Sequence, residues 1–136
     1  MLVGSAFGRD QDSVDLGAYQ WDHRLLIVFA PSENDPAYQS LKEQVDHQAG
    51  DILDRDLLVF HIFERGESRL DKGTLNPQQA SSLRKRFSIV PGKFRVILIG
   101  KDGGVKINRE SSIDLPEVFS TIDAMPMRQR EMKEKK

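Results

Sequence analysis

Residues 29–39, FAPSENDPAYQ, contain the best candidates for reactive side chains in the sequence. Four consecutive residues supply a hydroxyl, two carboxylates and an amide: Ser32, Glu33, Asn34 and Asp35. A serine hydroxyl becomes a nucleophile only when a neighbouring base takes its proton. The nearest histidine along the chain is His23, on the far side of the apolar run RLLIVFA. A nucleophilic Ser32 is therefore disfavoured against a capped helix start or a binding loop.

Other residue types that could do chemistry are absent or badly spaced. The chain contains no cysteine, which excludes disulfides, thiol catalysis and zinc–thiolate sites. Its three histidines show no HxH or HxxxH spacing, so no metal site and no cofactor are predicted. His61 lies inside the apolar run DLLVFHIF and is interpreted as a hydrogen-bonded core histidine. The stretch KDGG, 101–104, is interpreted as a hairpin turn, because no helix follows it.

Composition restricts the class of protein further. The 136 residues, 38% hydrophobic and 30% charged, fit one globular domain. A net charge of −1 gives no basic field for nucleic acid, and no apolar run reaches the roughly 20 residues needed to cross a bilayer. The start, MLVGSAFGRDQDS, lacks the basic region of a signal peptide. A cytoplasmic protein is expected, or an exported one if a leader was trimmed.

Apolar runs predict the strands that must position the polar loop. Buried strands are expected at 24–30, 56–63 and 94–99, since each run is short and rich in Leu, Ile, Val and Phe. After KDGG, the segment VKI completes a hairpin. The stretch ERGESRLDKGTL between the second strand and the next helix is expected to be a loop.

Capping signals and periodicity predict three helices. Asp35–Pro36 and Asn76–Pro77 have the cap-then-proline pattern of a helix start, and Gln79 completes a capping box. The first helix has one apolar face, and Gly50 interrupts it or lies near its end. That face consists of Tyr38, Leu41, Val45, Ala49 and Ile52. The last helix is expected from Leu115 to Ala124, with Asp114 as its cap and Pro126 as its end.

The resulting order, β-α-β-α-β-β-α, predicts an α/β, thioredoxin-like fold with a central mixed sheet flanked by helices. Residues 1–18 are expected to form an irregular arm, and 19–127 the domain. Residues 128–136 are expected to form a charged, solvated tail, or a docking tail for an acidic partner.

Several stretches, above all IGKDGGVK and IDAMPMRQ, resemble one family: the peroxiredoxin-like domain of equarin and the sushi-repeat extracellular proteins. The family also has small bacterial members of unknown function. Other stretches that carry the resemblance are YQWDHRLLIVFAPSENDP, DRDLLVFHI and the region from LRKRF onward, so that it spans Tyr19 to Met132. The resemblance implies a thioredoxin-like fold without a demonstrated catalytic activity.

Two marks of thioredoxin-like enzymes are missing or weak. Such enzymes hold a reactive cysteine at the first strand–helix junction and a cis-proline directly before the third strand. Here Lys93 and Phe94 precede that strand, and Pro91 stands two or three positions too early. We therefore expect no thiol chemistry and no catalytic residues. The junction and the facing segment form a candidate binding loop: Pro31, Ser32, Glu33, Asn34, Asp35, Lys93, Phe94 and Arg95.

Two further segments could form binding surfaces, an apolar one near the C-terminus and the basic run LRKRF. Met125, Met127 and Arg128 form a candidate partner surface, although the methionines could instead cover an apolar edge of the core. The run LRKRF places Arg84, Lys85 and Arg86 on an outer helix face, which is interpreted as solvated. A small anion or acidic-partner site near Lys93 and Arg95 is the alternative.

Three functions are compatible with these patterns. The favoured hypothesis is a non-catalytic interaction module that takes a protein partner. The alternative is an enzyme with cysteine-independent chemistry at the junction, a relative of peroxiredoxin-like oxidoreductases. A unit that forms homo-oligomers through a sheet edge is the third.

Overall fold

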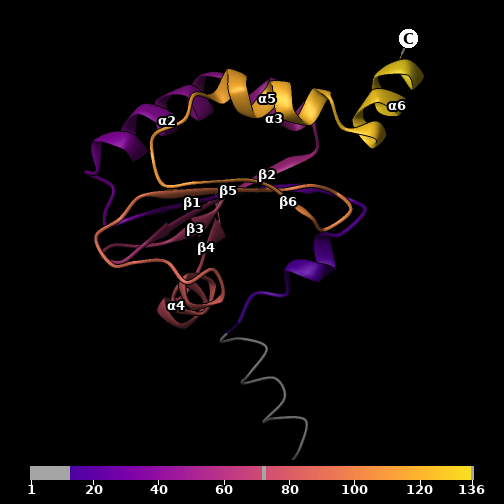
Figure 1. The fold of residues 1–136 in the computed structure, drawn as a ribbon. Helices are drawn as coiled ribbons and strands as arrows, with labels where there is room; N and C mark the ends of the chain where they lie inside the picture. Colours follow the sequence, from indigo (N-terminus) through magenta and orange to yellow (C-terminus); the bar gives the residue numbers. More distant parts are fainter. Residues whose placement is uncertain (1–12, 72, 136) are drawn as a thin grey trace, which may run out of the picture.

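A six-stranded mixed sheet forms the middle layer of the structure, a computed structural model that describes residues 13–71 and 73–135 (Figure 1). The strand order is β4-β3-β2-β1-β5-β6. The strands are β1 (Arg24–Ala30), β2 (Leu57–Phe63), β3 (Arg69–Leu70), β4 (Gly73–Thr74), β5 (Arg95–Ile99) and β6 (Val105–Arg109). The predicted mixed α/β sheet is confirmed.

β1 is the central strand of the sheet. It runs parallel to β2 and antiparallel to β5, with Phe29 opposite Ile62 on one side and Arg95 on the other. All seven residues of β1 are buried, as expected for a strand covered on both faces. The hairpin predicted at KDGG joins β5 to β6.

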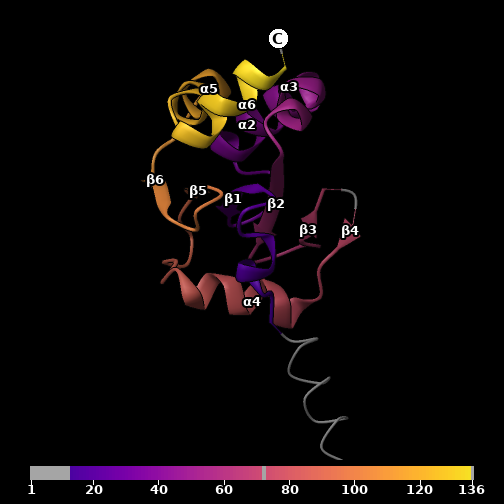
Figure 2. The same cartoon turned by 90° about the vertical axis from the view of Figure 1, so that its right-hand side faces the viewer.

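Helices cover both faces of this sheet, as Figures 1 and 2 show. The helices are η1 (Leu16–Tyr19), α2 (Pro36–His47), α3 (Ala49–Asp54), α4 (Pro77–Arg86), α5 (Leu115–Asp123) and α6 (Pro126–Glu134). One face carries α2, α3 and α5, and α4 and η1 lie on the other. Each face of the sheet has its own hydrophobic core, and alternate residues of β1 point into one or the other. Leu26 and Val28 belong to one core, and Leu25 and Ile27 belong to the other.

Two helix starts test the predicted caps. The Asn76 side chain accepts a hydrogen bond from the Gln79 amide at 2.7 Å, and the Gln79 side chain accepts one from the Asn76 amide at 2.9 Å, so the capping box is confirmed. Asp114 precedes α5, but its side chain makes no cap bond. The carboxamide of Gln44 accepts from the Leu115 amide at 2.6 Å instead.

The helix expected across 36–52 is two helices. Gln48 leaves the helical region, with φ −125° and ψ 36°, so α2 ends at His47 and α3 begins at Ala49. The break leaves Ala49 exposed while Ile52 still reaches the core. The loop expected after β2 also contains structure, because β3 and β4 form a short hairpin against β2. Two-residue strands are too short to show periodicity.

The C-terminal segment differs most from its prediction. Pro126 begins α6, since proline is tolerated at the first helical position, where no backbone donor is missed. The boundary expected between residues 127 and 128 therefore falls inside a helix, which continues to Glu134. At the other end, residues 1–12 of the expected arm lie outside the described residues, whereas Leu16 of η1 is buried. Among the described residues no helix is both long and apolar enough to cross a membrane.

Candidate functional site

The sheet brings the two halves of the candidate binding loop to one edge. Phe29 near the end of β1 lies opposite Arg95 at the start of β5, so the loop 31–35 and the segment 93–95 leave the sheet side by side. Glu64 ties this edge together: its amide donates to the Ala30 carbonyl at 3.3 Å, and its carboxylate accepts from the Gly92 amide at 2.6 Å. These contacts hold the two segments at the same edge of the sheet.

The polar side chains of the loop bond mainly to the loop's own surroundings. Asp35 caps α2 by accepting from the Tyr38 amide at 3.0 Å. The Ser32 hydroxyl oxygen accepts from the Asn34 amide at 3.2 Å, and Glu33 pairs with Arg69 at 3.4 Å. Ser32 thus accepts a backbone hydrogen bond, which is a structural role.

The facing segment contributes little to this edge. Phe94 is buried in the core, and Arg95 turns toward β6, where it donates to Asn108 at 2.9 Å and to Glu110 at 3.2 Å. Lys93 is exposed. Every peptide bond in the described residues is trans, so Pro91 does not present the backbone as a cis-proline does.

A buried polar chain lies beneath the junction. Arg69 donates to the Tyr38 hydroxyl at 3.1 Å, which leaves the phenol proton to donate to Nδ1 of His61 at 2.8 Å. Burial, with the nearby Arg69 charge, lowers the pKa of His61 to about 4. Burial raises the pKa of Tyr38, and Arg69 offsets part of that effect. Both groups are neutral at pH 7, and the predicted hydrogen-bonded core histidine is confirmed.

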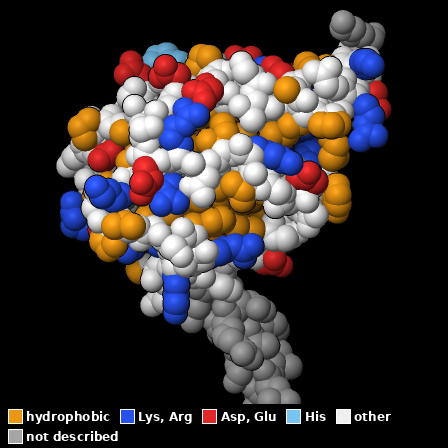
Figure 3. Space-filling view, in the orientation of Figure 1, with side chains coloured by type: hydrophobic (Ala, Val, Ile, Leu, Met, Phe, Trp, Pro, Cys, Tyr) orange, Lys and Arg blue, Asp and Glu red, His pale blue; other side chains and the backbone are white. Residues whose placement is uncertain are grey.

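A groove of about 220 Å³ lies at the other end of β1. Its walls come from the turn before β1, the β5–β6 turn and the α5–α6 junction. The lining residues are Trp21, Arg24, Gly100, Lys101, Asp102, Lys106, Met125, Pro126, Met127 and Arg130. Since β1 has seven residues, the groove lies about 20 Å from the loop 31–35. Figure 3 shows hydrophobic and basic side chains gathered below α6, at this end of the molecule. We call this site the α6 groove.

The α6 groove contains two of the three residues expected on a partner surface. Met125 and Met127 line it, and Met125 also packs against the core. Arg128 does not belong to it. Its side chain is 3% exposed and donates to Asp54 at 2.8 Å and to Asp123 at 3.0 Å. The cation of α6 that does line the groove is Arg130.

Trp21 gives the groove its largest apolar side chain. It is 59% exposed and has a φ of 76°, a left-handed conformation that bulky residues rarely adopt. Its amide donates to the Lys101 carbonyl at 2.6 Å, which ties the turn before β1 to the β5–β6 turn. Strained backbone of this kind costs about 1–3 kcal/mol and is concentrated at functional positions.

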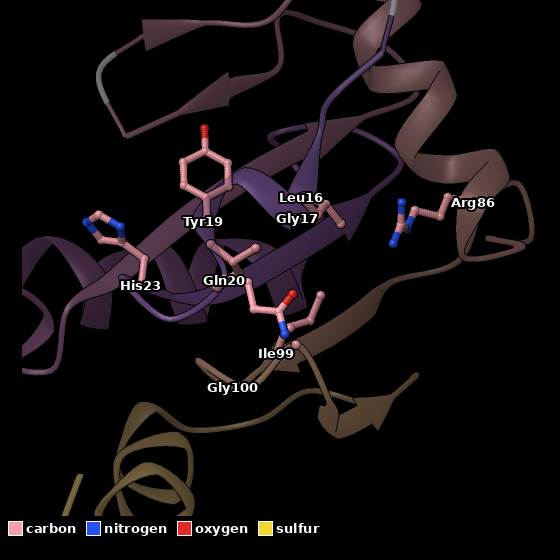
Figure 4. Close-up of a pocket in the computed structure, with 10 residues that line it drawn as sticks. Leu16, Gly17, Tyr19, Gln20, His23, Arg86, Ile99 and Gly100 are labelled. Atoms are coloured by element: carbon pink, nitrogen blue, oxygen red, sulfur yellow. The ribbon is translucent and has the colours of Figure 1, made fainter. Parts of the chain in front are cut away.

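A smaller pocket of about 110 Å³ lies between η1 and the sheet (Figure 4). Its polar side chains diverge: the Tyr19 hydroxyl and the His23 ring point away from Gln20, and Arg86 lies on the far side. Gln20 donates to the Asp102 carbonyl at 2.9 Å, so it holds the β5–β6 turn. This pocket lacks the convergent polar groups of a catalytic site.

The element order and sheet topology define a thioredoxin-like domain, and the chain has no cysteine for that fold's thiol chemistry. The reduced 2-Cys peroxiredoxin of Plasmodium vivax aligns with a TM-score of 0.63 at 15% identity, covering 86% of this chain and 85% of that one. The mitochondrial 2-Cys peroxiredoxin of Plasmodium falciparum aligns with a TM-score of 0.60 at 15% identity, covering 82% and 80%. These likenesses show the fold.

Sequence comparison gives the family. Residues 15–131 match the domain of unknown function DUF4174, and the chain belongs to that family. Coiled-coil domain-containing protein 80 of Danio rerio is 26% identical over 133 residues, which covers 86% of this chain and 15% of that protein. The chain thus spans a small part of that relative's length. The peroxiredoxin-like family predicted from the quoted stretches is confirmed.

The sequence patterns did not predict most of the residues that line the α6 groove. Trp21, Lys101, Lys106 and Arg130 come from segments up to about a hundred positions apart, and only the fold brings them together. A signal was nevertheless present. IGKDGGVK and IDAMPMRQ are the stretches that strand and helix patterning leave unexplained, and both contribute walls to this groove.

Proposed function

We propose that the domain is a cysteine-free, thioredoxin-like module that binds a protein partner and catalyses no thiol–disulfide or peroxide reaction. The observation that carries the proposal is the use of the junction's side chains. Asp35 caps a helix, Ser32 accepts from a backbone amide, and Glu33 pairs with Arg69. Hydrogen bonds and an ion pair with structural roles occupy the place where the fold does redox chemistry.

The polar chain beneath the junction supports the same proposal. Tyr38 and His61 are the groups closest in type to an acid–base pair, but they are only 1% and 5% exposed. A general base must come within hydrogen-bond reach of the proton that it removes from a substrate. The two side chains are closed off by their own packing, so no observation favours the cysteine-independent enzyme.

The test is a pair of turnover assays on the purified chain, one for peroxide consumption and one for reduction of a protein disulfide. A 2-Cys peroxiredoxin and a thioredoxin serve as positive controls. We expect rates equal to the blank. A clear turnover number with either substrate would overturn the proposal, and loss of that turnover in Ser32→Ala would place the reaction at the junction.

A further inference from the structure

We infer that the α6 groove binds a segment of a partner protein in which one apolar side chain lies next to a carboxylate. This inference rests on the proposed function and deepens it, since it assigns the binding site and the chemistry of the partner. The site lies at the end of β1 opposite the junction, so the fold's usual reactive edge takes no part.

The size and lining of the groove favour a peptide side chain. At about 220 Å³ it is smaller than the roughly 300–1,000 Å³ of typical small-molecule and cofactor sites. Trp21, Pro126 and Met127 provide its apolar surface. Tryptophan is enriched among residues that dominate binding energy, and methionine adapts its shape to a partner. One apolar side chain of a partner would bury much of the exposed Trp21 ring.

The charges around the groove favour a carboxylate. Four cations line it against one carboxylate, that of Asp102. Three of these cations have partners: Arg24 pairs with Glu131, Lys101 with Asp56 and Glu131, and Lys106 with Asp102.

Arg130 is the exception. It is exposed on α6 and makes no ion pair with any residue in the described part of the chain. A guanidinium binds a carboxylate through charge-assisted hydrogen bonds, which are stronger than neutral ones. Arg130 therefore sets the position of the acidic residue beside the apolar one.

Trp21 is the only tryptophan of the chain, so its fluorescence reports on this groove directly. The probe is a capped eight-residue peptide with a central Leu-Phe pair flanked by glutamates. We expect its addition to the full chain to shift Trp21 emission to shorter wavelength with saturation. Two further peptides test the chemistry, one with glutamines for the glutamates and one with glycines for Leu-Phe, and both should bind about tenfold more weakly or worse.

Two variants locate the site. Arg130→Glu reverses the exposed cation of α6, and we expect it to weaken binding of the acidic peptide about tenfold. Lys85→Glu makes the same charge change at an exposed position of α4, on the other face of the sheet. Its affinity for the acidic peptide should stay within about twofold of that of the native chain. Far-UV circular dichroism verifies that both variants fold.

Three results would overturn the inference: no emission shift at millimolar peptide, equal binding of the glutamine peptide, or equal weakening by Lys85→Glu. Light scattering gives a fourth. A dimer of the native chain that Met127→Gln dissociates would assign the groove to a second copy.

The inference and the proposed function fail in different experiments. Turnover in the enzymatic assays would overturn the proposed function, whereas a failed peptide titration without turnover would overturn only the assignment of the α6 groove.

Discussion

Arg24 and Glu131 form a two-pronged ion pair across 107 positions of sequence, with distances of 3.0 and 3.2 Å between the guanidinium nitrogens and the two carboxylate oxygens. Arg24 opens the central strand and is fully buried, and Glu131 lies on α6. Lys101 donates to the same carboxylate at 2.8 Å. This cluster fixes α6, and with it one wall of the α6 groove, to the base of the sheet.

Replacing Glu131 should therefore be destabilising. Glu131→Gln leaves the Arg24 charge buried without its counter-charge, and Arg24 already has one nitrogen, Nε, without a hydrogen-bond partner. We expect a loss of about 2–3 kcal/mol in the free energy of unfolding, measured by urea denaturation. Glu134→Gln, an exposed change on the same helix, is the matched control and should lie within about 0.5 kcal/mol of the native chain. Equal losses for both variants would contradict the anchoring role of Glu131.

His61 should make stability depend on pH in the weakly acidic range. Its pKa is lowered from 6.5 to about 4 in the folded chain, so the unfolded chain binds the proton more tightly. The stabilisation from neutral His61 is complete above pH 6.5 and is lost as pH falls toward 4. Between pH 7.5 and 5 we expect a loss on the order of 2 kcal/mol from this group.

The measurement is urea denaturation at those two pH values, with His61→Gln and the exposed His47→Gln compared with the native chain. The His61 variant should show a flatter pH dependence, and the His47 variant should keep the native one. A native pH dependence in His61→Gln would show that the buried imidazole is not the group responsible.

The two helix starts give a prediction about caps. Asn76→Ala removes a cap bond of 2.7 Å and should cost about 1 kcal/mol. Asp114→Ala removes a side chain that makes no cap bond, so it should destabilise the chain less than Asn76→Ala. Gln44→Ala should destabilise it more than Asp114→Ala, because the Gln44 side chain accepts the hydrogen bond of the Leu115 amide. Thermal unfolding of the three variants ranks them, and a cost for Asp114→Ala above that of Gln44→Ala would reverse the assignment.

Local sequence predicted the parts of the fold that local physics controls. The strand 24–30, the capping box at Asn76 and the core position of His61 follow from short apolar runs and cap chemistry. α6 could not be predicted in this way. Its residues are mostly polar, and Arg128 is buried because it pairs with Asp54, 74 positions earlier, and with Asp123 at the end of α5. Nothing in the run RQREMKEKK indicates those partners.

The candidate sites also divide into a part that local sequence predicts and a part that depends on the fold. The junction was found because a strand, a cap and a proline adjoin in sequence, whereas the structure gives its side chains local roles. The α6 groove depends on Trp21, Lys101 and Met127 meeting across the fold. Periodicity within one element carries no information about such a meeting.

A retention experiment with one purified binding partner and three immobilised baits separates the α6 groove from the junction. The baits are the native chain, a groove variant and a junction variant. The groove variant carries Met127→Gln and Arg130→Glu. The junction variant carries Ser32→Ala, Glu33→Ala and Asn34→Ala and keeps the Asp35 cap. We predict that the native chain and the junction variant retain the partner equally and that the groove variant loses it. Loss by the junction variant, with retention by the groove variant, would place the binding site at the junction and not in the α6 groove.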